Sequence, residues 1–265
     1  MGNYSFAPAI KQPSIIPYLV RGKDIAAEFL RKYEALVDSE FKGNTNLKVL
    51  KLRELENVPT IVGSNSVVLP IVKRVAPNYR TGRPEDLQRT LNDGDTLSIK
   101  GNHYVDLGVV LDFTRRNHEM AIDFWEQIQE GAYAMALQQG LSFAPNLNKG
   151  ITLEELPAVV VGYGIKNFDK GSYGLGLTIN TDTRIRPAKI LAGESGKFSD
   201  GEVSLETGLP SRLTGGNRTL YTSAQNIPSI DNLGLVRLYL DGDLNVDAGS
   251  GDLAYSNGNG RVVLF

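Results

Sequence analysis

Five oxygen-bearing side chains near the end of the chain have a spacing that suits a hard cation. They occupy positions 1, 3, 5, 7 and 12 of a calcium-binding loop, and they are Asp241, Asp243, Asn245, Asp247 and Asp252. An EF-hand loop also needs glycine at its sixth position, where this chain has Val246, and it needs flanking helices. The competing interpretation is a strand in which Leu244, Val246 and Ala248 face inward and the polar side chains between them face water. The regular alternation favours the strand, and calcium binding stays the alternative.

The same residues belong to a longer segment, residues 235–265, which we call the tail. Apolar segments at both ends of the tail bracket a stretch built almost wholly from Asp, Gly, Asn and Ser. Apolar ends need burial, whereas Gly, Asn and Ser form turns and cannot build a core. We therefore expect residues 235–240 and 262–265 to be paired or neighbouring strands and residues 249–260 to form an exposed loop. A polar loop on a rigid frame indicates binding rather than bond-breaking.

In its strand–polar loop–strand pattern and its ending NGNGRVVLF, the tail resembles the C-terminal region of variable proteins encoded by diversity-generating retroelements. The resemblance covers residues 235–265. It implies a C-type-lectin-like scaffold whose exposed loop positions vary and bind diverse ligands. On this resemblance the ligand-facing positions are Asp241, Asp243, Asn245, Ser250, Asp252, Tyr255, Ser256, Asn257 and Asn259.

Signals for an enzyme are few. The chain has no cysteine, which excludes thiol nucleophiles, disulfide frameworks and cysteine-ligated metal centres. Its two histidines, His103 and His118, are isolated, and such histidines are more often structural than catalytic. Residues 193–197, GESGK, resemble the nucleophile elbow G-x-S-x-G, but Lys197 replaces the last glycine and no helix is predicted to follow. We assign no catalytic residue. A carboxylate enzyme that holds a divalent metal through Asp241 and Asp243 is the third hypothesis.

The composition, with 41% hydrophobic and 22% charged residues and a net charge of −2, is that of an ordinary soluble chain. Lysine and arginine are spread evenly, whereas a nucleic-acid surface needs a basic patch, so nucleic acid is disfavoured as a partner. No apolar run reaches the roughly 18 residues of a membrane span. The first residues lack the basic and apolar regions of a signal peptide. We expect a cytoplasmic or particle-associated protein.

Hydrophobic periodicity predicts an α+β protein with two amphipathic helices in its N-terminal half and a β-rich C-terminal half. The helices are expected at residues 22–41 and 115–140. Most of residues 47–113 is predicted to be strand, with a hairpin at 95–113. The strands predicted in the second half are LPAVVVGYGI, SYGLGLTIN, RIRPAKIL, EVSLE, LVRLYL and RVVLF.

The first 20 residues are predicted to form an extended arm, because Pro8, Pro13 and Pro17 prevent a continuous helix. The arm is too apolar for a solvated tail, so it packs either on its own domain or on a neighbouring subunit. A polar link near residues 143–156 separates an α+β domain at 21–150 from a β-rich domain at 151–265. The sequence equally allows these two parts to form one continuous domain.

Together these features favour a non-enzymatic protein that binds a protein or surface ligand and assembles with itself as a homo-oligomer. The polar loop of the tail would present its recognition surface, the arm would link the subunits, and a phage or mobile element would be its origin. The runner-up is a purely structural subunit of a homo-oligomeric particle.

Overall fold

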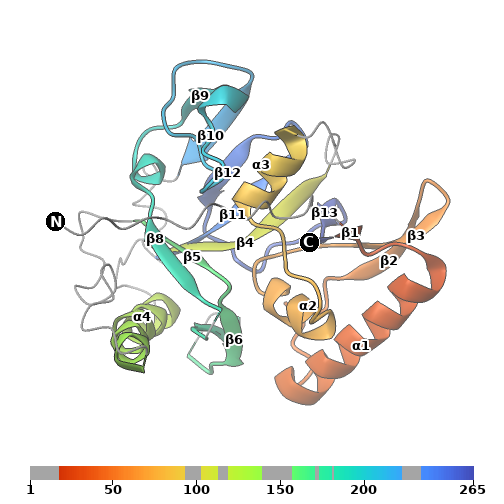
Figure 1. The fold of residues 1–265 in the computed structure, drawn as a ribbon. Coiled ribbons are helices and arrows are strands. Elements are labelled where there is room, and N and C mark those ends of the chain that lie inside the picture. The colour runs from red at the N-terminus through yellow and green to blue at the C-terminus, as the bar shows by residue number, and fades with distance from the viewer. Residues whose placement is uncertain are drawn as a thin grey trace.

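The computed structural model describes residues 18–92, 103–112, 119–138, 157–170, 173–180, 182–222 and 234–265. Within them, four α-helices accompany a mixed sheet of 10 strands and two small sheets of two strands each (Figure 1). All four α-helices precede residue 139, and most strands follow it. The predicted α+β class is therefore confirmed.

The helical elements are α1 (Lys23–Phe41), α2 (Leu69–Val75), α3 (Pro84–Asn92) and α4 (Glu119–Gln138), with the 3₁₀ helices η2 (Lys189–Ala192) and η3 (Asp200–Glu202). The strands of the first half are β1 (Tyr18–Leu19), β2 (Lys51–Leu55), β3 (Val58–Val62) and β4 (Tyr104–Asp112). Those that follow α4 are β5 (Ala158–Val161), β6 (Gly164–Asn167), β7 (Leu175–Thr178), β8 (Arg184–Pro187), β9 (Gly196–Phe198) and β10 (Arg218–Thr222). The tail contributes β11 (Leu235–Leu240), β12 (Val246–Ser250), β13 (Gly260–Arg261) and β14 (Val263–Leu264).

Strand β4 is the centre of the large sheet. The strand order is β2-β3-β13-β4-β11-β12-β10-β9, and β5 and β8 continue the sheet from β4. One edge of β4 pairs with β11. Its other edge pairs first with β13 and later with β5, and between them the Gly108 amide donates to the Gly82 carbonyl at 3.0 Å. The sheet thus draws strands from both sides of the link predicted at residues 143–156.

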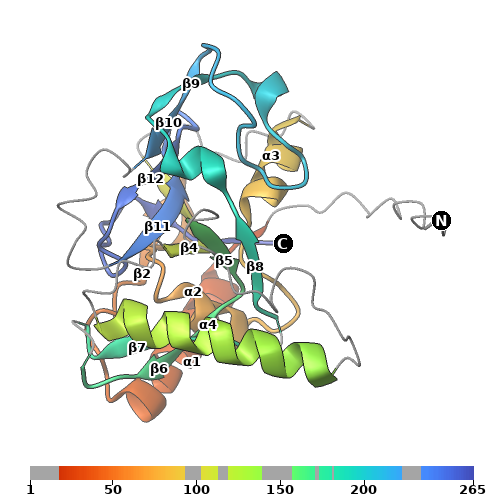
Figure 2. The ribbon, with the colours of Figure 1, turned by 90° about the vertical axis from the view of Figure 1, so that its left-hand side faces the viewer.

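The side chains of β4 alternate between two hydrophobic cores. Val105, Leu107, Val109 and Leu111 enter a core that also contains Leu87 of α3. Val110 points the other way, into a core shared with α1, α2 and α4. Figure 2 shows α1, α2 and α4 together on one side of the central strands and α3 on the other. Because both faces are covered at this point, every residue of β4 is buried.

Both predicted helices are present, as α1 and α4. The buried stripe of α1 includes Ala26 and Phe29, whereas Ile25 is 56% exposed. On α4, Phe124 and Ile128 are buried and Trp125 is partly buried against the same core.

Three sequence-based assignments were wrong. The segment SNSVVLPIVKRV contains helix α2 instead of a strand, because Pro70 occupies its first turn, where a missing amide costs nothing. Helix α3 was missed, although Pro84, Glu85 and Asp86 are the residue types that favour a helix start. The segment EVSLE does not form a continuous strand, because Glu202 ends η3 and Val203 makes only an isolated bridge to Pro210.

Residues 1–17 of the predicted arm, residues 93–102 of the predicted hairpin region and His118 lie outside the described residues. Of the arm, Tyr18–Leu19 form β1, which pairs with β14.

Substitutions on α4 test the core that this helix shares with α1 and α2. Phe124→Ala removes a fully buried ring and should lower the free energy of unfolding by about 3–5 kcal/mol, because it leaves a cavity. The exposed Glu126→Ala on the same helix should change it by less than about 0.5 kcal/mol. Urea unfolding followed by circular dichroism measures both. Equal effects of the two substitutions would show that α4 does not pack as described.

Candidate functional site

A pair of opposite charges lies inside the sheet, on the face of β4 that carries Val110. Asp106 of β4 and Arg237 of β11 have side chains that are 0% and 3% exposed, and Arg237 Nη1 lies 3.5 Å from Asp106 Oδ1. The pairing of β11 with both of its neighbours shifts in register between Arg237 and Tyr239. The register shift therefore begins at Arg237, the residue of β11 that forms the ion pair.

Three tyrosine rings surround the guanidinium group of Arg237. Its central carbon lies 5.2 Å from the ring centroid of Tyr104, 4.5 Å from that of Tyr239 and 5.4 Å from that of Tyr255. Such cation–π contacts stabilise a cation that has lost its hydration. Arg237 Nη1 also donates to the Tyr255 carbonyl at 2.8 Å. One side chain of β11 therefore holds the later part of the tail against the sheet.

A buried polar segment, residues 63–66, lies next to this pair. The phenol of Tyr104 donates to the Ser64 carbonyl and that of Tyr163 to the Ser66 carbonyl, both at 2.9 Å. The hydroxyl oxygens of Ser64 and Ser66 and both carboxylate oxygens of Asp106 are buried without a hydrogen-bond partner among the described residues. Burial raises the pKa of Asp106 to about 6, against the opposing attraction of Arg237. The cluster is closed and strongly desolvated, which suits a structural role better than catalysis.

The end of the tail lies over segment 63–66, and exposed side chains alternate along it with partly buried ones. Tyr255, Asn257 and Asn259 are exposed, whereas the residues between them are partly buried and Gly260 is buried. We call these three residues the outer row.

The backbone that carries the outer row is fixed by groups of the first half of the chain. The Asn65 side chain donates to the Ala254 carbonyl at 2.8 Å, and the Ser66 amide donates to the Leu253 carbonyl at 3.1 Å. The Tyr104 amide donates to the Asn259 carbonyl at 3.2 Å. A Cβ atom on Gly260 would lie 2.6 Å from the Ser64 amide nitrogen, so only glycine allows this close approach.

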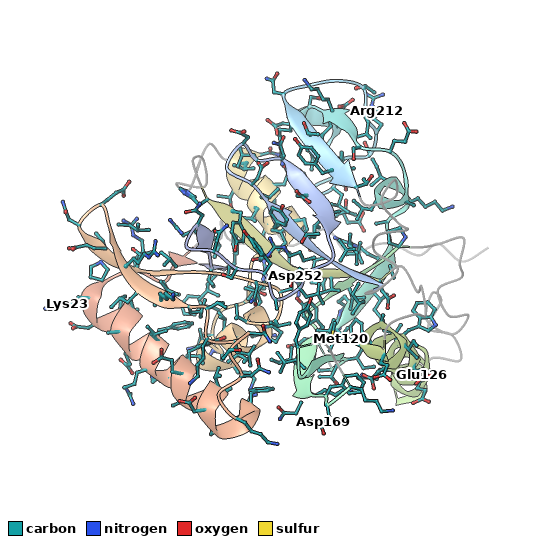
Figure 3. The ribbon with its side chains drawn as sticks, turned by 180° about the vertical axis from the view of Figure 1, so that it is seen from behind. Lys23, Met120, Glu126, Asp169, Arg212 and Asp252 are labelled. Carbon is teal, nitrogen blue, oxygen red and sulfur yellow. The ribbon has the colours of Figure 1, made fainter. Side chains whose placement is uncertain are left out.

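The predicted oxygen ligands have other tasks. Asp241 caps the β11–β12 turn, since its Oδ1 accepts from the amides of Asp243 and Asn245, both at 2.9 Å. Asn245, which we expected to face water, is only 8% exposed, and its Oδ1 accepts from the Thr219 amide at 2.6 Å. Asp252, near the centre of the face in Figure 3, accepts from the Tyr173 phenol at 3.1 Å.

The remaining predicted residues are divided between the turn and the surface. Asp243 is exposed, Asp247 and Ser250 are half-buried on β12, and the Ser256 hydroxyl accepts from the Ser64 amide at 3.2 Å. Among the described residues, no group of three or more acidic or histidine side chains is placed to hold a metal ion. The strand interpretation is confirmed from Val246 onward by β12, in which Val246 and Ala248 are buried, whereas Leu244 lies in the connection between β11 and β12 with a φ of 65°.

The predicted relation between the two ends of the tail was wrong. Residues 235–240 form β11, but β4 separates β11 from β13, and β14 pairs with β1. The tail therefore flanks the central strand on both sides.

A second group of polar and aromatic residues, which the sequence analysis missed, crosses three neighbouring strands. Tyr221 of β10 lies opposite Asp247 of β12, which lies opposite Tyr239 of β11. We call these three residues the tyrosine row. They line a hollow of about 330 Å³ together with Ser195, Thr222, Gly249 and Ser250. The alternation in LVRLYL and RTLYT, which puts tyrosine opposite the apolar face, was the available signal.

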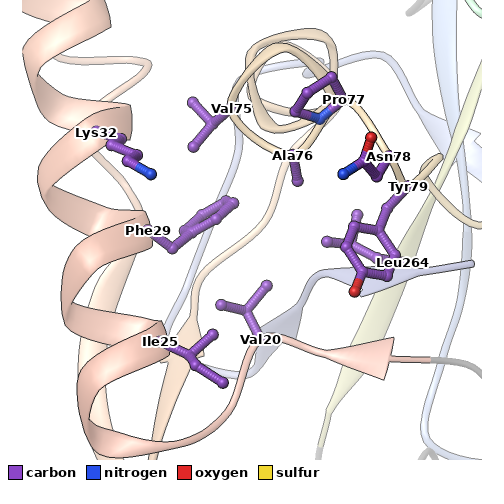
Figure 4. Close-up of a pocket in the computed structure, with 10 residues that line it drawn as sticks. All are labelled: Val20, Ile25, Phe29, Lys32, Val75, Ala76, Pro77, Asn78, Tyr79 and Leu264. Carbon is purple, nitrogen blue, oxygen red and sulfur yellow. The ribbon is translucent and has the colours of Figure 1, made fainter.

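A third feature is an apolar groove between α1, α2 and β14, with a volume of about 410 Å³. Figure 4 shows Phe29 of α1 facing the end of α2, with Val20 and Leu264 along the other side of the groove. Ile25 and Tyr79, also in its wall, are 56% and 42% exposed.

Comparison with known proteins assigns no family: no protein-family model, no curated protein and no solved structure matches the chain. In the part of the chain that the structure describes, no helix has the length and apolar character needed to cross a membrane.

Because the carboxyl group of Asp106 is buried, we expect the stability of the protein to depend on pH. The pKa of Asp106 is raised from 3.8 to about 6 in the folded state, so the folded protein binds this proton more tightly than the unfolded chain. Its contribution to stability therefore grows as pH falls toward 4 and is lost as pH rises through 6. Between pH 7 and pH 5 the wild-type protein should gain about 1 kcal/mol relative to Asp106→Asn. Urea unfolding at both pH values measures this difference.

Asp169→Asn, at an exposed site, is the matched control and should follow the wild-type protein at both pH values. A constant difference between wild type and Asp106→Asn would show that Asp106 keeps its ordinary pKa.

Proposed function

We propose that this protein is a non-enzymatic binding protein of phage or mobile-element origin, which recognises a surface ligand through the polar surface of its tail. The outer row, with its exposed side chains on an anchored backbone, is the observation that supports the proposal. The calcium site is not part of it, because the carboxylates that suggested it do not form a metal-binding group in the described residues.

The anchoring contacts explain why this surface suits recognition. Four carbonyls of the segment, those of Leu253, Ala254, Tyr255 and Asn259, accept hydrogen bonds from Ser66, Asn65, Arg237 and Tyr104. All four are backbone acceptors, so they do not depend on which side chains point outward. Side chains can then change at the surface while the backbone keeps its position, which is the property that a recognition surface on a rigid scaffold requires.

The outer row is the place to test this function. Tyr255→Ser, Asn257→Ser and Asn259→Ser together should cost about 1 kcal/mol of stability, chiefly from the lost contact between Tyr255 and Arg237. Fluorescein-labelled protein is incubated with a panel of Gram-negative and Gram-positive cells and measured by flow cytometry. The wild-type protein should bind at least one strain, and the triple variant should bind it at least about tenfold more weakly.

Gly260→Ala is the matched control within the same segment. It should destabilise the protein instead, because its Cβ would lie 2.6 Å from the Ser64 amide nitrogen. The proposal fails if the wild-type protein binds no strain, or if the triple variant remains folded and binds as well as the wild type.

The apolar groove favours a second candidate function, a structural subunit of a homo-oligomeric particle. Val20, the last residue of the predicted arm, lines the groove, and the arm also contains Phe6, Ile15 and Ile16. A groove of this character would receive the arm of another subunit, and each buried apolar side chain would contribute about 1.5–3 kcal/mol.

Assembly is tested by light scattering coupled to size-exclusion chromatography. Deletion of residues 1–17 and the groove substitution Ile25→Asp should both lower the oligomer mass. Leu205→Asp, at a residue that is 49% exposed outside the groove, should leave it unchanged. If both changes in the arm and groove leave the mass at its wild-type value, the groove does not serve assembly.

A further inference from the structure

We propose that the tyrosine row binds a neutral polyhydroxylated ligand, a terminal sugar ring of a glycan or another polyol. The inference deepens the proposed function, because it names the ligand class for part of the same tail-bearing surface. It rests on the side chains of Tyr221, Tyr239 and Asp247, none of which belongs to the outer row.

The row exists because one face of the sheet extends beyond the helices that cover it elsewhere. On β10, β11 and β12 the apolar residues Leu220, Leu238 and Val246 enter the core with α3. The alternate residues therefore point to the opposite face. In Figure 2, α1, α2 and α4 lie toward the other end of the molecule from β10 and β12. Tyr221 is 43% exposed as a result.

The carboxylate of Asp247, in the middle of the tyrosine row, is a hydrogen-bond acceptor with a fixed orientation. Tyr239 Oη donates to Asp247 Oδ2 at 2.7 Å, and the Gly249 amide donates to Asp247 Oδ1 at 2.7 Å. Burial, together with the Asp247 hydrogen bond, raises the pKa of Tyr239, which keeps its phenol a donor. Each carboxylate oxygen has a further lone pair for a ligand donor. Asp247 is therefore fixed in orientation and can still accept from two neighbouring hydroxyl groups.

The rest of the hollow matches the other surface of a sugar ring. The exposed ring of Tyr221 presents a negative π face, which attracts the polarised C–H bonds on the apolar side of a pyranose. Ser195 and Ser250 add hydroxyl groups at the margin. A volume of about 330 Å³ is at the lower end of the range for small-molecule sites. An aromatic platform beside a carboxylate suits a ligand that is apolar on one side and hydroxylated at its edge.

Charge argues against the other small-ligand classes. Among the described residues that line this hollow, Asp247 is the only charged one, and its charge repels phosphate and carboxylate ligands. A single carboxylate that already accepts two hydrogen bonds is a poor site for a divalent cation. A wholly apolar ligand would leave the aspartate desolvated.

The test uses the full-length protein with the methyl glycosides of glucose, galactose, mannose and N-acetylglucosamine. Saturation-transfer NMR and calorimetry should detect at least one glycoside with a Kd on the order of 1 mM, the affinity of a small ligand in a shallow site. Tyr221→Ala and Asp247→Asn should each weaken binding at least about tenfold. Tyr221→Phe, which keeps the ring, should retain it. Tyr79→Ala removes a tyrosine of matched exposure, 42%, outside this hollow and should have no effect.

Absence of binding by all four glycosides overturns the inference, and so does equal weakening by Tyr79→Ala. If Tyr221→Ala lowers the melting temperature, the comparison of Tyr221→Phe with Asp247→Asn decides, since both keep the size of the side chain. The proposed function is judged separately by the binding of cells. Cell binding that requires the outer row, without any glycoside binding, removes the polyol inference alone. Glycoside binding with cell binding that ignores the outer row removes the proposed recognition surface alone.

Discussion

The buried ion pair of Asp106 and Arg237 is the interaction on which the arrangement of this protein depends. It joins the central strand to its neighbour β11 in a place where an ordinary sheet would have two apolar side chains. Removing either partner would leave a charge buried in the core, which is far more costly than never having had the pair. Three tyrosine rings surround its guanidinium group, and Arg237 also donates to the Tyr255 carbonyl of the tail.

One face of the large sheet is divided between two uses. Near β4 and β5 it packs against the core formed with α1, α2 and α4. Toward β10 and β12 the same face carries Tyr221 and Asp247, which are exposed and half-buried. Arg237 and its tyrosines stand at the border between these regions. The same strands therefore contribute to a packed core and to a polar surface. A ligand at this surface would contact a backbone whose position is fixed by the core on the opposite face of the sheet.

Local patterns were sufficient for part of this structure. The helical periodicity around Phe124 and Phe29 predicted α4 and α1, and the alternation of Val246 and Ala248 predicted β12. The same kind of pattern failed for α2, where β-branched residues suggest a strand and Pro70 starts a helix. The candidate tail was found by its composition. The partners that hold it, such as Asn65 and Tyr104, lie more than 150 residues earlier in the chain. No local pattern could assign these partners, because they are brought to the tail only by folding. The same holds for Gly260, whose lack of a Cβ atom matters only because the folded chain places Ser64 against it.

The position of β13 has a consequence for how the chain folds as it is synthesised. β13 lies between β3 and β4, so residues 260–261 close a gap between strands that left the ribosome long before them. The N-terminal strands must wait with open edges until the tail emerges, and such edges are prone to pair with other chains. Contacts over this separation also make folding slow, because the closing loop is long. The sheet is therefore completed only when residues 260–261 can enter it, and aggregation of the open edges competes with folding until then.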